Sequence, residues 1–530
     1  MIEVKELPLS IDTFEEIIED NYIYVDKTKE IWKIIEKRKK YHFLSRPRRF
    51  GKSLLISTMK ELFLGNEKLF KNLYIHDKWE WNRKYPVLHF DMSKHDSTSP
   101  KNLERSIIHS IEKIANKKQI NIDKEISLKD KFTDLIEGIH ESIGEKLVVL
   151  VDEYDKPILD NIGNLKIANK NREVLKSFYN ILKSSGQYIH FVFITGVSKF
   201  SQTSIFSGSN VLKDLTFNEN YSKICGYSQD ELLNYFDEYI NSFAKSASMT
   251  KNSLLKKIKS YYDGYSWDGK NFLYNPYSIL SSLDDKLFSN YWFKTGTPSF
   301  LIELIKKEND ISSLITKLKI DPNSLTDFEL GNINLTSALL QSGYLTIKDK
   351  REYEGEILEY VLDIPNKEVH DSIFKELSSI YTNKSYSELK ILAYDLLSSF
   401  KTSDSEKFNK VMKILISRIS YLDHKRDESF YHALFLSIMG LLGFSIRGEI
   451  ITNIGRFDAG LIHENIVVIC EIKYNDRENL DKLTDIAMNQ IIKRRYYESY
   501  LNKDIVILLG LGFSNMDVQG KLKSLNKKSL

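Results

Sequence analysis

Apolar residues in the first part of the chain follow two spacings in turn. Stretches with one apolar face at helical spacing, such as Lys101–Asn116 and Asn171–Ser184, separate short runs that are apolar almost throughout. These runs have the length of buried strands: Tyr41–Leu44, Pro86–Asp91, Lys146–Asp152 and Ile189–Thr195. The alternation predicts a mostly parallel sheet with helices on both faces, and such sheets bind ligands at the carboxyl ends of their strands.

The middle of the chain is predicted to be mainly helical. Gln229–Phe243 and Lys251–Tyr262 have helical apolar spacing. The aromatic residues of the turn-rich stretch Tyr262–Gly269 are predicted to pack in a core, with stacking on nucleic-acid bases as the alternative. A helix, a hairpin and a second helix then predict a winged-helix-like unit, which either binds DNA or serves as a spacer: Ser337–Ser342, Tyr344–Lys348, Tyr360–Ile364 and Asn366–Leu377. A helical connector is expected over 384–421.

The last part of the chain has a compact pattern of its own. Its elements are predicted in the order αβββαβ: Glu428–Gly440, Ser445–Thr452, Gly455–Leu461, Asn465–Lys473, Leu480–Tyr500 and Asp504–Leu509. The chain is therefore expected to be an α/β multidomain protein with domains at 1–215, 216–325, 326–420 and 421–530.

Composition excludes several classes of protein. The 530 residues carry 76 basic and 73 acidic side chains, so the net charge of +3 is too small to indicate nucleic-acid binding by itself. The two cysteines, Cys225 and Cys470, cannot form a disulfide framework or a zinc site, which favours a reducing compartment and a cytoplasmic location. No apolar run approaches the ~18 residues of a membrane span.

The first candidate for chemistry follows the first predicted strand. Ser45–Ser53 has the sequence SRPRRFGKS and precedes a helical pattern, which is the context of a phosphate-binding P-loop. Lys52 is expected to reach the β- and γ-phosphates of ATP, and Ser53 to hold Mg²⁺. The general motif has glycine where this chain has Arg46. The predicted nucleotide-binding set is Arg46, Arg48, Arg49, Phe50, Gly51, Lys52 and Ser53, completed by Asp152.

The third predicted strand ends in two carboxylates. Asp152 is expected to hold the Mg²⁺ shell, and Glu153 to orient and deprotonate the attacking water. The fourth strand ends near the same place. Thr195, Ser198 or Lys199 is expected either to sense the γ-phosphate or to form a structural turn.

The second candidate for chemistry lies in the αβββαβ pattern. Glu471 and Lys473 alternate to the same side of one strand, and Asp458 lies on the neighbouring strand. Two carboxylates on adjacent strands favour a shared Mg²⁺ that activates water at a phosphodiester, and Lys473 is expected to stabilise the developing charge. Glu428, or alternatively Glu449, is expected to complete the metal shell.

A later helix of this pattern carries polar side chains that could touch a DNA backbone: Gln490, Lys493, Arg494 and Arg495. A merely solvated helix face is the other interpretation of the three basic residues.

Four motifs together resemble a bacterial family of AAA-ATPase-like proteins: Tyr24–Thr28, Arg46–Ser53, Val151–Pro157 and Thr195–Phe200. In that family arginine regularly replaces the first glycine of the P-loop. The resemblance covers about residues 1–215 and implies that the region after it acts as a lid. Family members commonly carry a C-terminal domain of the PD-(D/E)xK type, with a restriction-endonuclease-like fold. Asp458, Glu471-Ile472-Lys473 and Gln490 resemble the active-site pattern of that domain.

The expected function is ATP hydrolysis coupled to a Mg²⁺-dependent DNA endonuclease, and a role in defence against foreign DNA or in mobile-element biology is expected by analogy alone. A nucleotide-switched DNA- or protein-binding module with a non-cleaving nuclease-like domain is the alternative. P-loop ATPases of this type often assemble, so a homo-oligomer is one expected partner arrangement, together with DNA.

Overall fold

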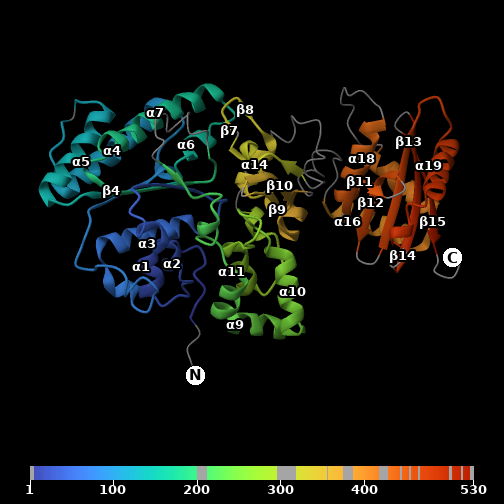
Figure 1. Cartoon of the computed structure of the whole chain (residues 1–530), viewed down its shortest axis with the longest axis horizontal. Helices are drawn as coiled ribbons and strands as arrows, with labels where there is room; N and C mark the ends of the chain where they lie inside the picture. Colours follow the sequence, from blue (N-terminus) through green and yellow to red (C-terminus); the bar gives the residue numbers. More distant parts are fainter. Residues whose placement is uncertain are drawn as a thin grey trace. The chain divides into compact units, whose positions relative to one another are not determined.

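The computed structural model describes residues 5–123, 125–199, 212–294, 318–326, 328–354, 356–373, 386–416, 428–441, 444–452, 455–463, 466–500, 504–514 and 517–525. These residues form two compact units (Figure 1). The first runs to residue 294 and includes 319–369, and the second includes 370–525. The predicted helix Asn366–Leu377 extends past residue 373, so its end lies outside the described residues, as does Phe200.

A parallel sheet forms the centre of the first unit. Its strands are β1 (Tyr41–Ser45), β2 (Val87–Asp91), β3 (Leu147–Asp152), β4 (Ile189–Gly196) and β5 (Lys213–Asp214). The order is β2-β3-β4-β1-β5, and every neighbouring pair is parallel. All six residues of β3 are buried, which explains why its apolar run is continuous rather than alternating. The predicted sheet is confirmed, and β5 is an additional strand too short to show a periodicity.

Helices cover both faces of this sheet (Figure 1). One side carries α3 (Lys52–Leu64) with α1 (Phe14–Glu19) and α2 (Thr28–Ile35), and the other carries α4 (Pro100–Lys118), α5 (Leu128–Ile143) and α7 (Leu165–Ser184). The short α6 (Lys156–Leu159) follows β3. In α4 the buried residues are Leu103, Ile107, Ile111 and Ala115, spaced by four, so one stripe faces the layer beneath.

A group of helices follows the sheet: α9 (Gln229–Ser246), α10 (Lys251–Tyr262), α11 (Pro276–Asp285) and α12 (Tyr291–Lys294). A capping box of Ser228 and Glu231 starts α9. Leu7, Ile23 and Val25 from the beginning of the chain lie in the same apolar core as these helices. The N-terminal segment is therefore part of this helical layer.

The winged-helix-like part consists of α14 (Leu335–Ser342) and the antiparallel hairpin of β9 (Thr346–Tyr353) and β10 (Glu356–Asp363). β6 (Leu318–Ile320) pairs with β10, and β7 (Phe328–Glu329) pairs with β8 (Asn332–Ile333). The hairpin strands are longer than predicted because their outer residues are charged and exposed, so no apolar alternation marks them.

Glu368 is a carboxylate buried at the end of this part. Its Oε2 accepts a hydrogen bond from Ser278 Oγ at 2.7 Å, and its Oε1 accepts one from the Trp292 N–H at 2.8 Å. Burial raises the pKa of Glu368 from its ordinary value of 4.5 to about 7. The side chain is 0% exposed, so solvent does not screen the charge.

We expect Glu368 to make the first unit less stable as pH rises. Between about pH 4.5 and about pH 7 the folded state keeps a proton on Glu368 that the unfolded state has released, so stability present at low pH is lost through this window. Relative to Glu368→Gln, the parent should lose roughly 3 kcal/mol between about pH 4 and about pH 8.

Denaturant unfolding followed by tryptophan fluorescence measures this loss, because all five tryptophans lie before residue 301, in the first unit. Glu104→Gln, at an exposed position on α4, is the matched control. Parallel pH profiles for the parent and Glu368→Gln would rule out the expected effect.

The second unit contains the helices α16 (Tyr386–Thr402), α17 (Ser405–Ile416), α18 (Glu428–Leu441) and α19 (Leu480–Arg494). Its sheet has the order β11 (Ser445–Thr452), β12 (Gly455–His463), β13 (Ile466–Tyr474), β14 (Ile505–Ser514) and β15 (Asp517–Leu525). β13 and β14 are parallel, and the other pairs are antiparallel. The predicted αβββαβ order is present, with two differences.

The first difference is that the predicted helix Leu480–Tyr500 ends early. Arg495 has φ +51° and terminates α19, and a short 3-10 helix at Glu498–Tyr500 follows. The second is the added edge strand β15, whose lysine-rich sequence shows too few apolar residues to predict a strand. Phe408 of α17 packs against β15 so closely that a Cβ on Gly520 would lie 2.4 Å from its ring.

The two faces of this sheet have separate cores. Ala459, Leu461, Val468 and Cys470 share one core with residues of α16, α17 and α18. Val467, Ile469, Val506 and Leu508 share the other core with Ile491 of α19. Because side chains alternate, Asp458, Glu471 and Lys473 belong to the α19 face.

None of the helices in the described part of the chain is long and apolar enough to cross a membrane.

Candidate nucleotide and nuclease sites

The P-loop joins β1 to α3 in the first unit. Gly51 is the N-cap of α3 and has φ +89°, and Arg49 has φ +65°. A Cβ on Gly51 would meet no atom within 4 Å, so glycine is needed there for the backbone conformation and not for space. The loop thus directs the first amides of a 13-residue helix toward the carboxyl edge of the sheet, where an anion is favoured.

Lys52 is held over this loop. The side chain is only 3% exposed, its Nζ donates to the Pro47 carbonyl at 3.2 Å, and it lies 3.6 Å from Glu153 Oε1. The structure therefore brings together the predicted phosphate-binding lysine and the predicted general base.

Asp152 ends β3 beside the P-loop. Its Oδ1 accepts hydrogen bonds from Thr195 Oγ1 at 2.6 Å and from the Glu153 N–H at 2.9 Å. Glu153 has φ +50°, a conformation that non-glycine residues rarely adopt and that is often found at functional sites. Both carboxylates are thereby fixed at the strand end.

The three candidate residues at and after the end of β4 have different partners. Thr195 contacts Asp152, as described above. Ser198 donates from its N–H at 2.6 Å and from its Oγ at 2.5 Å to Asp155, whose pKa is raised to about 6 by burial and then by the charge of Glu153. Lys199 forms an ion pair with Asp214 at 2.6 Å. Only Thr195 of the three contacts the predicted Mg²⁺-binding carboxylate; Ser198 and Lys199 hold the chain after β4 in place.

A pocket of about 450 Å³ opens in front of these residues. Six residues predicted for the nucleotide site line it together with both carboxylates: Arg48, Arg49, Phe50, Gly51, Lys52, Ser53, Asp152 and Glu153. Its other wall is formed by Ile23 and Val25 of the N-terminal segment and by Tyr277 and Leu280 of α11. The sequence did not assign the two residues of α11 to the nucleotide site. The Arg49 guanidinium lies 4.8 Å from the centre of the Tyr277 ring.

Two predicted members of this set point their side chains elsewhere. Phe50 is buried edge-on against Tyr265 and Trp267, with ring centres 4.8 Å and 5.3 Å away, so only the rest of the residue can border the pocket. Arg46 does not line the pocket, and its guanidinium bonds backbone carbonyls. The packing interpretation of the Tyr262–Gly269 aromatics agrees with these contacts.

The second site lies on the α19 face of the other sheet. Asp458 Oδ2 accepts a hydrogen bond from the Ile472 N–H at 2.7 Å, which ties β12 to β13. Lys473 Nζ donates to Glu471 Oε1 at 3.0 Å, and the Gln490 amide of α19 donates to the same oxygen. The predicted trio is therefore assembled, and Gln490 supports Glu471 instead of pointing to solvent.

Burial raises the pKa of Glu471 to about 7, and the charge of Asp458 adds to this shift against the hydrogen bond from Lys473. Burial opposes the charged form of Lys473, but its contact with Glu471 and the nearby charges of Asp458 and Glu428 raise its pKa overall. Glu428, on α18, is thus close enough for its charge to act at this site. The side chain of Glu449 lies outside what the structure describes.

The donor atoms fit a divalent metal in one specific respect. Within the part of the chain that the structure describes, Glu471 Oε2 is buried without a hydrogen-bond partner. An orphaned carboxylate oxygen is costly unless a ligand satisfies it. Among the described residues, no group of three or more acidic, histidine or cysteine side chains is close enough to hold a metal alone. A metal held by Asp458 and Glu471 would complete its shell with water and phosphate oxygens, as Mg²⁺ usually does.

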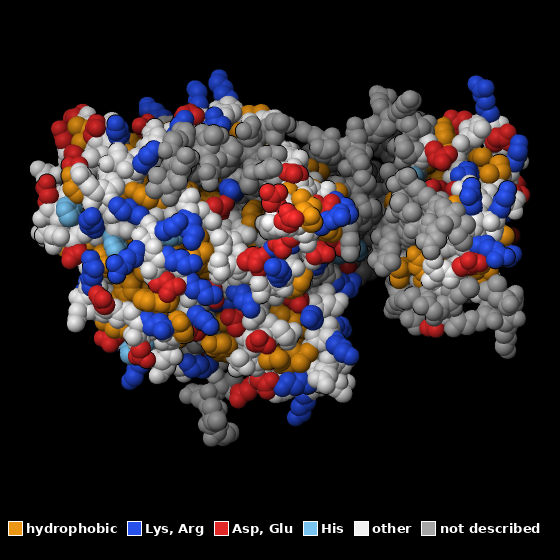
Figure 2. Space-filling model, viewed as in Figure 1, with side chains coloured by type: hydrophobic (Ala, Val, Ile, Leu, Met, Phe, Trp, Pro, Cys, Tyr) orange, Lys and Arg blue, Asp and Glu red, His pale blue; other side chains and the backbone are white. Residues whose placement is uncertain are grey.

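The basic residues of α19 remain at the surface. Lys493, Arg494 and Arg495 are exposed, and Arg495 pairs with Glu498 at 3.1 Å. Figure 2 shows Lys and Arg side chains, mixed with acidic and apolar ones, on the side of this unit where α19 and β15 lie. The surface is compatible both with backbone contacts to DNA and with a solvated helix face.

Comparison with known proteins finds two family models that match this chain. The family described as "Predicted AAA-ATPase" matches residues 8–206, and the "PD-(D/E)XK nuclease superfamily" matches residues 426–520. The "Uncharacterized protein in vnfD 5'region" of Azotobacter chroococcum mcd 1 is 34% identical over 517 residues, which are 96% of each chain. The chain belongs to this family of predicted AAA-ATPases with a PD-(D/E)XK nuclease superfamily domain.

The family match places both sets of predicted residues inside the expected domains. Lys52, Asp152 and Glu153 fall within the AAA-ATPase match, and Asp458 and Glu471 fall within the nuclease-superfamily match. Among solved structures, Cdc6p from Pyrobaculum aerophilum is 12% identical with a TM-score of 0.27, covering 66% of this chain and 93% of that one. A TM-score this low supports no conclusion about the fold or function of this chain.

Proposed function

We propose that the first unit binds and hydrolyses ATP with Mg²⁺, and that the second cleaves DNA with Mg²⁺. The observation that carries the first part is the meeting of Lys52, Asp152 and Glu153 at one pocket. The observation that carries the second is the grouping of Asp458, Glu471 and Lys473 around the unpartnered Glu471 Oε2.

The residues of the first pocket divide the work of ATP hydrolysis. Lys52 leaves its contacts with Pro47 and Glu153 to bind the β- and γ-phosphates, which frees Glu153 to take a proton from the attacking water. Ser53 and Asp152 hold Mg²⁺, with Asp152 oriented by Thr195. Mg²⁺ supplies neutralisation of the phosphate charge when bound. The water oxygen bonds to the γ-phosphorus while the bond to the bridging oxygen breaks.

The residues of the second site serve phosphodiester hydrolysis. Asp458 and Glu471 hold Mg²⁺, which would polarise the phosphate and lower the pKa of water when bound. Glu428, on α18, is proposed to act through its charge, which helps to raise the pKa of Lys473, and not as a metal ligand. Lys473, anchored on Glu471, stabilises the charge that develops on the phosphate. Lys493, Arg494 and Arg495 are proposed to hold the DNA backbone, and Gln490 to orient Glu471.

ATP occupancy is proposed to gate or load the nuclease. The biological setting proposed is foreign-DNA defence or mobile-element biology in the cytoplasm, with the chain acting alone or as a homo-oligomer. These assignments rest on analogy with the domain combination.

The deciding experiment is cleavage of supercoiled plasmid with Mg²⁺, with and without ATP, by the parent and Glu471→Ala. Cleavage by the parent alone supports the nuclease assignment, and an ATP effect on its rate supports the coupling. If neither protein cleaves but both bind DNA in an ATP-dependent way, the nucleotide-switched binding function replaces the proposal.

A further inference from the structure

Arg46 stands where the general P-loop motif has its first glycine, and it is a wholly buried cation. The residue is 0% exposed. One guanidinium nitrogen, Nη1, donates to the Ser45 carbonyl at 2.8 Å and to the Thr216 carbonyl at 2.9 Å, and Nη2 donates to the Tyr221 carbonyl at 3.3 Å. The guanidinium of Arg46 therefore joins the end of β1 to the segment that follows β5.

The flat face of the guanidinium is covered by an aromatic ring. Trp267 is 5% exposed, and its ring centre lies 4.1 Å from Arg46 Cζ. Phe50 packs edge-on against the same indole. Burial lowers the pKa of Arg46 to about 10, so the side chain remains charged at neutral pH. A site that stacks on the guanidinium plane and accepts hydrogen bonds from both of its terminal nitrogens is specific for arginine over lysine.

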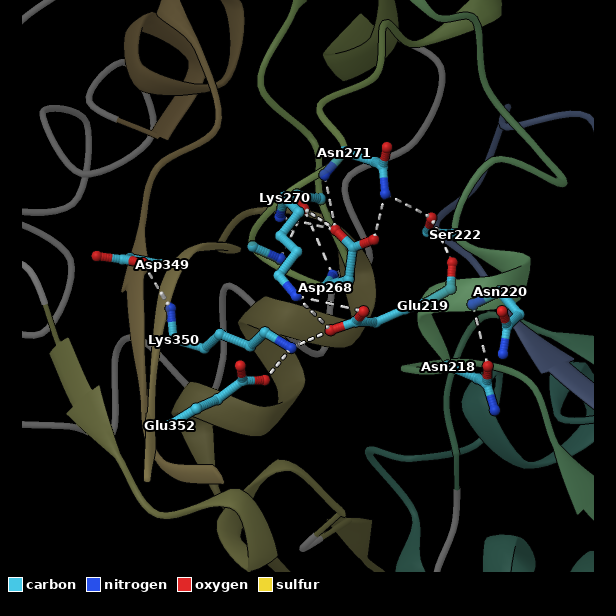
Figure 3. A network of polar contacts seen from close by, with 12 residues as sticks. Asn218, Glu219, Asn220, Ser222, Asp268, Lys270, Asn271, Asp349, Lys350 and Glu352 are labelled. Atoms are coloured by element: carbon cyan, nitrogen blue, oxygen red, sulfur yellow. Dashed lines mark hydrogen bonds and ion pairs between the residues drawn. The ribbon is translucent and has the colours of Figure 1, made fainter. Parts of the chain in front are cut away.

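A polar network holds the segment whose carbonyls accept the hydrogen bonds of Arg46 (Figure 3). Glu219, between Thr216 and Tyr221, accepts from Lys270 at 3.2 Å and pairs with Lys350 of β9. Asn271 donates to Ser222 Oγ at 3.2 Å. The network links the segment with both carbonyl acceptors, and the turn at Trp267, to the hairpin.

We propose that Arg46 is a positioning residue for the phosphate site and that Trp267 is its partner. This rests on the proposed binding of ATP at the same loop. Arg46 does not border the pocket; it fixes the backbone at the start of the loop, so that the amides before Lys52 are aligned before phosphate arrives. A prealigned loop loses less conformational freedom on binding. Phosphate affinity then depends on a tryptophan far away in the sequence.

The test compares the affinity for MgATP with that for adenosine, which lacks phosphate. Arg46→Gly, which restores the general motif, should weaken MgATP binding by about tenfold or more and leave adenosine binding within about twofold. Trp267→Ala should act in the same direction, and the two effects should not add in the double variant. Arg46→Lys should not restore the affinity for MgATP, because lysine keeps the positive charge but lacks the planar guanidinium with its several donors.

Arg38→Gly is the matched control, because Arg38 is exposed and already has φ +50°. Any of four results would overturn the proposal. Two concern Arg46→Gly: an unchanged affinity for MgATP, or an equal loss of affinity for adenosine. The others are additive effects in the double variant, or an affinity for MgATP in Arg46→Lys that equals the parent's. If Arg46→Gly does not fold, the MgATP affinities of Trp267→Ala and Trp267→Phe are compared instead. Equal affinities in these two variants would overturn the proposal. A parent that binds no MgATP refutes the proposed function instead.

Discussion

Lys52→Ala is expected to lower the rate of ATP hydrolysis by at least about 100-fold, because removing one preorganised charge donor from a phosphoryl-transfer site costs this much or more. Lys52 is the buried ammonium at the P-loop, and it also engages Glu153. The substitution should change stability little, since Glu153 is partly exposed and its pair with Lys52 is long. Phosphate release from ATP, followed over time, measures the effect.

Lys71→Ala is the matched control, because Lys71 is exposed just after the first 3-10 helix (Glu67–Phe70) of the same unit. Tryptophan fluorescence would check that the first unit of the variant stays folded, because all five tryptophans lie in that unit. If Lys52→Ala hydrolyses ATP at a rate within about threefold of the parent's, this pocket is not the site of ATP hydrolysis.

Asp458→Asn is expected to reduce Mg²⁺-dependent DNA cleavage by at least about 100-fold while ATP hydrolysis continues, because losing a metal-binding charge costs several kcal/mol of transition-state stabilisation. The asparagine oxygen can still accept the Ile472 N–H, so the strand pairing is preserved. Loss of the Asp458 charge should also lower the pKa of Glu471, since that charge helps to raise it.

Asp504→Asn, at an exposed position before β14, is the control for this variant. Mg²⁺ binding by titration calorimetry gives a second measurement that does not depend on activity, and it should weaken in Asp458→Asn alone. Equal cleavage by the parent and Asp458→Asn would contradict the two-carboxylate site.

Some features were predicted from short stretches of sequence because local physics specifies them. The continuous apolar run of β3 predicts a strand buried on both faces, and its end places Asp152 and Glu153 at the ligand edge of a parallel sheet. Glycine followed by lysine and serine at a helix start predicts the P-loop. Strict alternation along β13 places Glu471 and Lys473 on one face.

Other features were settled by contacts between distant segments. The sequence placed Gln490 among possible DNA contacts, but the packing of α19 on β13 turns its amide to Glu471. Thr195, Ser198 and Lys199 were equivalent candidates until their partners Asp152, Asp155 and Asp214 distinguished them. β15 is an edge strand whose partner, and not its periodicity, defines it.

Arg46 shows most clearly which features the sequence alone does not predict. By itself the sequence determined that a P-loop with an unusual arginine precedes a helix, that one buried strand ends in two carboxylates, and that a Glu-x-Lys pair shares one face of another strand. Only the tertiary structure decided that this arginine is buried under Trp267 and bonded to the carbonyls of Thr216 and Tyr221. The reason is physical: periodicity fixes which face a residue occupies, whereas a side chain's partners depend on which distant segments pack against that face.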